Sequence, residues 1–380
     1  MVAGESVTHA TAPEVSRAPA RTGGLAEFLL AGGITPLLFP LSWLLRRSIG
    51  LDASELAVGF LMFHAAFVIN DPHFAVTYCL FYRAFASRAF GGAFGPWQRA
   101  RYVAVGILAP LALAVWAAVA LATRSAVALG LLIQLMFLLV GWHYVKQGFG
   151  VMVVLAARRG VFFSRRERWA ILAHCLVGWA YAWASPADAG TEVEEKGVVY
   201  TTLAHPLWLE RLTHAAFLST ACVLVVVLAI KWRREGRLPL LTPLTALLCS
   251  IWSWSIYSSI DPLVVYVVPA LHSVQYLYFV WLLRSREARE REGPPWFETA
   301  APVRLGLLAA SALGLGWVLF HIGPSALDDL LVSKRMRLSG SAMGATPYFA
   351  ALYTLVNVHH FLMDSVIWRR ENPETKYLLR

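Results

Sequence analysis

Apolar segments long enough to cross a lipid bilayer recur throughout this chain of 380 residues. A membrane-spanning helix needs about 20 mainly apolar residues, within a range of about 17–25. Because the lipid interior offers no partners to backbone N–H and C=O groups, such segments fold as helices. The chain is therefore predicted to be an all-α, polytopic transmembrane helical bundle of about ten spans. The expected spans are residues 25–45, 53–82, 102–122, 125–157, 169–185, 215–230, 238–257, 262–283, 303–321 and 346–370.

The two ends of the chain differ from this apolar body. Residues 1–23 are rich in Ala, Thr, Pro and Arg and carry no apolar periodic run, which is typical of a disordered tail. The first apolar run begins late and lacks a small-residue cleavage pattern, so a signal peptide is not expected. Residues 24–370 are predicted to form the transmembrane domain, and residues 371–380 a short cytoplasmic tail.

Composition excludes a soluble protein, because 58% of the residues are hydrophobic and only 15% are charged. The net charge of +10 does not indicate a nucleic-acid partner, since the basic residues lie in short loops between apolar runs. The four cysteines lie within or beside those runs without a CxxC spacing. They are interpreted as packing residues, not as disulfides or a zinc site.

The distribution of basic residues predicts an orientation. With both termini in the cytoplasm, 24 of the 33 Lys and Arg residues fall on the cytoplasmic side and 8 outside. Cytoplasmic loops of membrane proteins carry such an excess. The acidic loop at residues 188–195 then lies outside. The expected localisation is an integral, multi-pass protein of the bacterial inner (cytoplasmic) membrane.

The last apolar segment carries polar residues in its inner half. An ionisable group at that depth costs roughly 2.5–3.5 kcal/mol on insertion scales, so it usually faces a bundle interior and has a function there. On a helix, Asn357, His360 and Asp364 share one face, with His359 beside them. This face is predicted to point toward the centre of the bundle.

Three other spans that run in the same direction carry a histidine at a comparable depth. Counted from the first cytoplasmic arginine of each span, the offsets are 9–15 residues for His73, His143, His272, His359 and His360. At a rise of about 1.5 Å per residue, these depths agree within roughly 10 Å. His64 lies higher, unless a break at Asp71–Pro72 bends its helix and turns it toward the same interior.

Histidines with polar neighbours at helical spacing are typical of metal sites, because a bound imidazole usually donates its second N–H to a carboxylate, amide or carbonyl. The candidate metal ligands are His64, His73, His143, His272, His359 and His360. The candidate residues that orient them are Asp71, Gln147, Gln275, Asn357 and Asp364. The candidate catalytic residues are Tyr276 and Lys146. Proton relay, substrate binding and plain helix–helix hydrogen bonding stay open as alternatives.

Neutral imidazoles with a nearby carboxylate suit Fe²⁺, Zn²⁺ or copper, and they exclude Mg²⁺ or Ca²⁺ as the preferred ion. The apolar surroundings favour a lipophilic substrate, a lipid or an isoprenoid, that enters from the membrane lipids. Oxygen chemistry on such a substrate favours iron. The leading prediction is a histidine-ligated, non-haem iron oxygenase, with an electron donor left open as a partner.

Four segments carry a resemblance to a known family: FHAAFVINDPHF, GWHYVKQGFG, LHSVQYLYFVW and NVHHFLMDSVIWR. They resemble the one-histidine-per-helix pattern of the Brp/Blh family of membrane β-carotene 15,15'-dioxygenases. The resemblance implies an all-helical membrane fold and a non-haem iron bound by His73, His143, His272 and His360. It covers these motifs, not the whole chain. The HxxxH and HxxHH boxes of membrane fatty-acid desaturases and hydroxylases are absent.

The alternative prediction is a proton-coupled or small-solute transporter. In that case the histidines would form a relay with Asp71, Lys146 and Asp364. Broken helices mark transporter sites, and Asp71–Pro72 is a candidate break. No convincing inverted repeat is found. A third possibility, a non-catalytic scaffold, is disfavoured by the cost of so many buried polar groups.

Overall fold

The computed structural model describes residues 24–186, 188–236, 240–332 and 342–379, so the tail predicted at residues 1–23 lies outside the described residues. Within these ranges the chain is almost entirely helical, with one two-stranded sheet formed by β1 (Glu192–Glu195) and β2 (Val198–Thr201). The all-helical class is therefore confirmed. The helices are α1 (Gly24–Phe28), α2 (Thr35–Ile49), α3 (Leu51–Ala66), α4 (Asn70–Tyr82), α5 (Phe85–Ala89), α6 (Pro96–Val103), α7 (Ala109–Ala122), α8 (Ala126–Arg158), α9 (Arg165–Ala184), α10 (Leu207–Glu235), α11 (Leu241–Leu248), α12 (Val264–Glu292), α13 (Ala301–Trp317), α14 (Gly323–Leu331) and α16 (Pro347–Ile367).

Short π-helical or 3₁₀ turns connect or extend several of these helices. They are η1 (Leu29–Gly33), η2 (Ala104–Leu108), η3 (Cys249–Ile256), η4 (Ser258–Ile260), η5 (Val318–Ile322) and η6 (Pro373–Leu378). Helix starts follow local sequence signals. The Ser164 hydroxyl accepts a hydrogen bond from the backbone N–H of Glu167, and the Glu167 carboxylate accepts one from the backbone N–H of Ser164. The two bonds form a capping box at the start of α9. Pro347 occupies the first turn of α16, where its missing N–H leaves no hydrogen bond unmade.

Six helical segments of the described chain are long and apolar enough to cross a membrane, and seven if the bent pair α1–α2 counts as one span. They support the multi-pass membrane character, whereas the count of ten is not confirmed. The other expected spans are also helical, but α9 and α16 do not qualify and α11 with η3 is short. Apolar side chains such as Leu212, Val225 and Ile230 of α10 are exposed, as on a helix that faces lipid.

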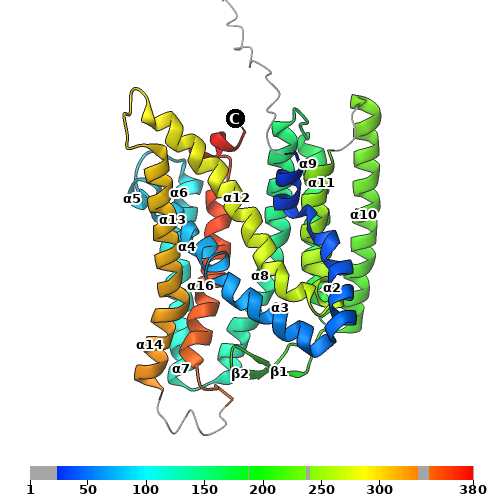
Figure 1. The fold of residues 1–380 in the computed structure, drawn as a ribbon, viewed down its shortest axis with the longest axis vertical. Helices are drawn as coiled ribbons and strands as arrows, with labels where there is room; N and C mark the ends of the chain where they lie inside the picture. Colours follow the sequence, from blue (N-terminus) through cyan, green and yellow to red (C-terminus); the bar gives the residue numbers. More distant parts are fainter. Residues whose placement is uncertain (1–23, 187, 237–239, 333–341, 380) are drawn as a thin grey trace, which may run out of the picture.

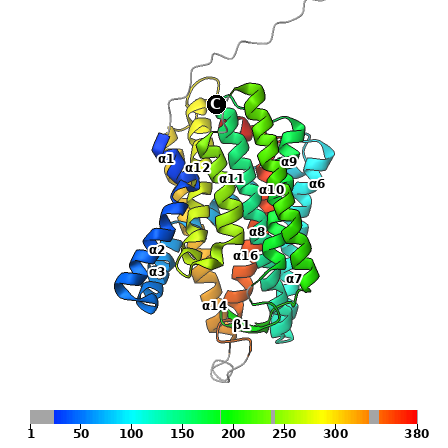
Figure 2. The ribbon, with the colours of Figure 1, turned by 90° about the vertical axis from the view of Figure 1, so that its right-hand side faces the viewer.

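Both ends of the described chain lie at one end of the bundle, and the β1–β2 hairpin lies at the other (Figures 1 and 2). We call these the basic end and the hairpin end. At the basic end, arginines bind carboxylates that are mostly far from them in sequence. The pairs are Arg158 and Arg159 with Glu27, Arg83 and Arg284 with Glu287, and Arg88 with Glu374. The loops predicted to share the cytoplasmic side therefore do share one end of the molecule.

Two expected spans are interrupted. The first bends by 69° between η1 and α2, next to Gly32, whose φ of 114° lies in the region that favours glycine. The second is interrupted at residues 67–69, between α3 and α4, a few residues before the expected break. Pro72 itself lies in the first turn of α4, a position that helices tolerate.

Helix α16 lies inside the bundle, between α4 and α8 and behind α12 in Figure 1. From Val356 to Asp364 every side chain except the partly buried Leu362 is buried. Neighbouring helices thus separate α16 from lipid, which explains why it carries polar residues. Helices α4, α8, α12 and α16 meet at the centre of the bundle.

Candidate metal centre

Four helices each supply one buried histidine to the centre of the bundle. His73 comes from α4, His143 from α8, His272 from α12 and His360 from α16, and each is at most 3% exposed. Five of the six ring pairs have centroids between 4.5 and 6.3 Å apart. The histidines expected at one depth from their offsets therefore come together in space.

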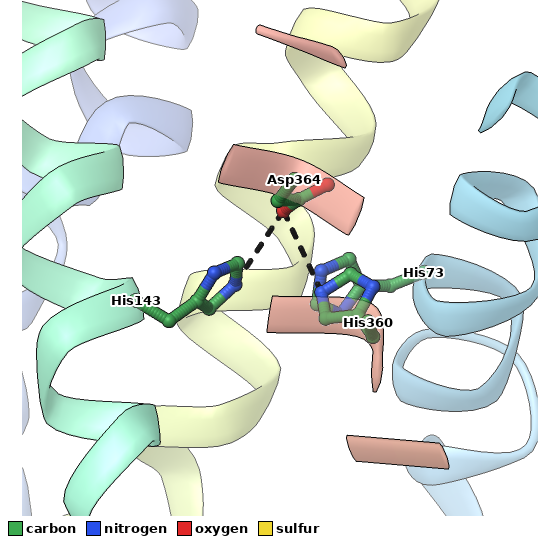
Figure 3. A group of neighbouring side chains, drawn as sticks. All are labelled: His73, His143, His360 and Asp364. Atoms are coloured by element: carbon green, nitrogen blue, oxygen red, sulfur yellow. Dashed lines mark ion pairs between the residues drawn. The ribbon is translucent and has the colours of Figure 1, made fainter. Parts of the chain in front are cut away.

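The donor atoms of three of these histidines and of Asp364 form a compact group. One ligand atom from each of His73, His143, His360 and Asp364 lies within 4.8 Å of the others. Figure 3 shows the three rings, with the Asp364 carboxylate above them. Oδ2 of Asp364 is 3.6 Å from Nε2 of His143 and also 3.6 Å from Nε2 of His360. Two ligands of one ion at about 2.1 Å are at most roughly 4.2 Å apart, so both contacts fit a shared ion.

His272 lies beside this group. Its Nε2 is 2.9 Å from Nε2 of His143, and its Nδ1 is buried without a hydrogen-bond partner among the described residues. Two nitrogens bound to one ion at adjacent positions, each at about 2.1 Å, are roughly 3.0–3.4 Å apart. His272 is therefore placed either to hydrogen-bond His143 or to serve as a further ligand.

Several ring nitrogens at the centre lack partners. Nε2 of His73 and both ring nitrogens of His360 are buried and make no hydrogen bond to the described residues. An unsatisfied buried polar group costs about 1–3 kcal/mol, and native proteins leave few of them. Unpartnered imidazole nitrogens that converge beside a carboxylate are the donor set that a transition-metal ion requires.

Neighbouring polar groups orient the candidate ligands. Nδ1 of His73 is 3.0 Å from the hydroxyl of Ser273, which leaves its Nε2 facing the group. Oδ1 of Asp364 accepts hydrogen bonds from the Tyr276 hydroxyl at 2.8 Å and from Trp368 Nε1 at 3.3 Å. Such partners fix ring and carboxylate orientation in metal sites. The predicted Tyr276 thus contacts the site through Asp364.

The other predicted orienting residues bind backbone or one another. Gln147 donates to the His272 carbonyl at 3.2 Å and to Oε1 of Gln275 at 2.8 Å. Gln275 donates to the carbonyl of Ala31. Asn357 donates to the carbonyl of Tyr353 one turn earlier on α16. These amides join α8, α12 and η1 around the site, but within the described residues none of them is hydrogen-bonded to an imidazole nitrogen.

Two predicted ligands lie outside the group. His64 is exposed on α3, and its Nδ1 lies 2.9 Å from the carbonyl of Phe60, to which it donates. The break before α4 therefore does not turn His64 inward. His359 is buried, but Nε2 donates to the Val105 carbonyl at 2.9 Å and Nδ1 accepts from the Tyr78 hydroxyl at 3.0 Å. Both ring nitrogens of His359 are thus hydrogen-bonded to protein groups.

Asp71 contacts a histidine that the sequence patterns did not single out. Its Oδ2 is 2.7 Å from Nε2 of His321 in η5, and the His321 ring stacks on Phe67. His64, seven residues before Asp71, is exposed and takes no part in this contact. The Asp71–His321 pair joins η5 to the start of α4.

Some residues of the site were not predicted. Thr77, whose hydroxyl lies 2.6 Å from that of Tyr276, follows His73 by one helical turn. Trp368 follows Asp364 by one turn. The i+4 spacing was a usable signal for both residues. Ser273 and His321 reach their partners from other helices, so no local pattern marks them.

Two cavities border the group on opposite sides. One, of about 290 Å³, is lined by His143, Tyr276 and Asp364 and extends along α8 and α16 toward Lys146 and Arg369 at the basic end. The other, of about 210 Å³, is lined by His73, His272, Asn70, Asp71, Tyr353 and Asn357 among others. Phe361 lines both cavities. The candidate metal centre therefore lies between two spaces that a small molecule can enter.

No protein-family model, no curated protein and no solved structure matches the chain.

Proposed function

We propose that the chain is a membrane-embedded, histidine-ligated metalloenzyme, a non-haem iron oxygenase that acts on a lipophilic lipid or isoprenoid substrate. The observation that carries the proposal is the convergence of buried His73, His143, His360 and Asp364. Nε2 of His73 and both ring nitrogens of His360 have no hydrogen-bond partner among the described residues. Leaving such groups buried and unpaired is costly, and an ion would satisfy them together.

The donor chemistry favours iron. Histidine nitrogens with a single carboxylate and open positions are typical of non-haem Fe²⁺ oxygenases, whereas Zn²⁺ and copper are the alternatives. Bound iron would supply the activation of molecular oxygen. The protein's own residues orient the ligands, through Ser273 and Tyr276, and exclude bulk water from the centre.

The surroundings support a lipophilic substrate. Aromatic and aliphatic residues provide most of the lining of both cavities, and ligand pockets are typically apolar with a few polar groups. The resemblance of the four histidine segments to membrane β-carotene dioxygenases agrees with this substrate class. In this proposal substrate is drawn from the membrane lipids.

The proposed setting is a bacterial inner membrane, with ten spans and with both termini in the cytoplasm. Its support is the gathering of the basic loops at one end of the bundle, opposite the β1–β2 hairpin. In this orientation the cavity lined by Lys146 lies on the cytoplasmic side of the candidate metal centre.

The transporter alternative also has a specific observation in its favour. Two cavities on opposite sides of one polar layer, together with the Asp71–His321 pair, resemble the parts of a gated proton path. A transporter would move protons or solute without binding a stoichiometric transition metal.

Oxygen uptake separates the two functions. Purified protein loaded with Fe²⁺ should consume oxygen in the presence of a bacterial membrane-lipid extract, and ¹⁸O₂ should label a lipid product. His143→Ala should abolish both signals, whereas His359→Ala should retain them, because His359 bonds only protein groups. Proton uptake by proteoliposomes, without oxygen consumption, would instead establish the transporter.

A further inference from the structure

The larger cavity is mostly apolar, but polar side chains of two chemically different kinds line it. Its walls come from α8, α12, α16 and η6, and they include Trp142, Phe149, Val154, Phe279 and Leu378. One kind comes from the candidate metal centre and comprises His143, Tyr276 and Asp364. Its volume of about 290 Å³ is near the lower limit of small-molecule pockets, about 300 Å³.

Two basic side chains also line this cavity. Lys146 follows His143 by one turn on α8, and Arg369 follows the end of α16. Both residues line the same cavity. Both side chains are only partly exposed, and a positive charge is costly to remove from water unless it is paired.

The described residues offer these two cations no ion pair. Arg369 Nε donates to the carbonyl of Ser365, and within the described chain no carboxylate lies within ion-pair distance of Lys146 or Arg369. Glu371 pairs with Arg101 at 3.8 Å, and Asp364 is bound by Tyr276 and Trp368. The cations therefore face the cavity as a site for an external anion.

We propose that this cavity binds an amphipathic anion, whose carboxylate or phosphate head is held by Lys146 and Arg369 and whose apolar chain extends to the histidines. Arg and Lys both bind such heads through charge-assisted hydrogen bonds. The substrate class rests on the proposed function, whereas binding of the anion does not require the metal. Arg369 is nine residues after His360, just beyond the end of α16. At a rise of about 1.5 Å per residue, the reacting carbon lies within about 14 Å of the head.

Gly150 provides a way to close the cavity without disturbing the fold. It follows Lys146 by one turn on α8 and lines the cavity, and an added Cβ would meet nothing within 4 Å. Leu is a better helix former than Gly, so Gly150→Leu should not weaken α8. Gly306 of α13 is exposed, and an added Cβ there would likewise meet nothing within 4 Å. Gly306 is not one of the residues that line the cavity. Gly306→Leu is the matched control.

The test is binding of three radiolabelled probes to the purified full-length protein in nanodiscs, with protein-free nanodiscs as background. The probes are hexadecanoate, hexadecyl phosphate and uncharged hexadecanol, and the comparison of the two anions identifies the head group. Hexadecanoate or hexadecyl phosphate should bind at least tenfold more tightly than hexadecanol. Lys146→Gln and Arg369→Gln should each raise the Kd of the preferred anion about tenfold or more. Gly150→Leu should abolish binding, and Gly306→Leu should not change it.

Metal content, measured on the same samples, separates this inference from the proposed function. Lys146→Gln and Arg369→Gln should retain the wild-type metal content, because neither residue belongs to the ligand group. Protein without metal that still binds the anion would contradict the oxygenase and support the anion site. Equal affinity for hexadecanol and both anions would overturn the anion site. So would unchanged anion binding in folded Lys146→Gln and Arg369→Gln proteins.

Discussion

Oδ2 of Asp364 lies 3.6 Å from Nε2 of His360, which precedes it by one turn of α16. The same oxygen lies 3.6 Å from Nε2 of His143 on α8, so a single carboxylate links two helices across the centre. Its other oxygen accepts hydrogen bonds from Tyr276 and Trp368. Hydrogen bonds thus hold Oδ1 of Asp364 in place, and Oδ2 lies toward the imidazoles of His143 and His360.

Asp364→Asn keeps the size of this side chain but removes its charge. A neutral amide oxygen is a weaker ligand, and the bond from Tyr276 loses its ionic acceptor. We expect metal affinity to fall roughly 10–100-fold, the range seen when the polar support of a metal site is altered. Competition with a chelator of known affinity measures the change. A metal affinity of Asp364→Asn equal to that of the wild type would show that Asp364 neither binds the metal nor supports its ligands.

His360 and His359 are adjacent but have different surroundings. His360→Ala should remove most bound metal, because both of its nitrogens are buried with no hydrogen-bond partner among the described residues. His359→Ala should retain the metal but lower the free energy of unfolding by about 1–3 kcal/mol, because Tyr78 and the Val105 carbonyl lose their partner. Metal analysis and thermal unfolding of the two variants provide the comparison. Loss of metal in His359→Ala and retention of metal in His360→Ala would show that His359, and not His360, binds the metal.

Tyr276→Phe removes the hydroxyl that donates to Asp364 and contacts Thr77. We expect a 10–100-fold loss of metal affinity, with the fold retained, because the carboxylate is no longer held in place. Tyr278 is the control, since it lies on the same helix but its hydroxyl bonds Glu27 near the basic end. Tyr278→Phe should keep the metal affinity of the wild type. An equal loss in both variants would indicate general disruption of α12.

Glu167 gives a pH-dependent contribution to stability outside the spans. Burial alone would raise the pKa of Glu167, but hydrogen bonds with Ser164 and the charges of Lys231 and Arg234 outweigh it and hold the pKa below its ordinary value of 4.5. A carboxyl group with a lowered folded-state pKa stabilises the fold above its ordinary pKa, and this stabilisation is lost as pH falls through the folded-state value. The thermal unfolding temperature of the protein in detergent should therefore fall as the pH is lowered below about 4.5. Glu167→Gln should remove this component, and an unchanged pH profile in that variant would contradict it.

The sequence predicted the helices and the common depth of the histidines because lipid restricts both. Spans must be helical, so counting residues from the basic loops gives a depth scale that needs no tertiary structure. His73, His143, His272 and His360 meet for this reason. The depth scale does not give the rotation of each helix, and His64 and His359 show the consequence. His64, which lies higher, is exposed on α3, and His359, at the common depth, bonds other protein groups.

The span count shows a related limit. Hydropathy distinguishes helices that contact lipid, but α16 is shielded by its neighbours and can carry His359, His360 and Asp364. Partners on distant helices, such as Ser273 for His73 and His321 for Asp71, depend on packing that no local spacing encodes. The depth of the histidines along their helices therefore located the site. Which residues form the site could be identified only from the fold.

The metal content and ligation of the purified wild-type protein test the central claim most directly. We predict one transition-metal ion, iron, per chain. X-ray absorption at its edge should show imidazole scattering and nitrogen or oxygen ligands at about 2.0–2.2 Å. His143→Ala should lose this signal, while His64→Ala, altered at an exposed position, should keep it. Wild-type protein without a stoichiometric transition metal, or with a metal that shows no imidazole scattering, would contradict the account.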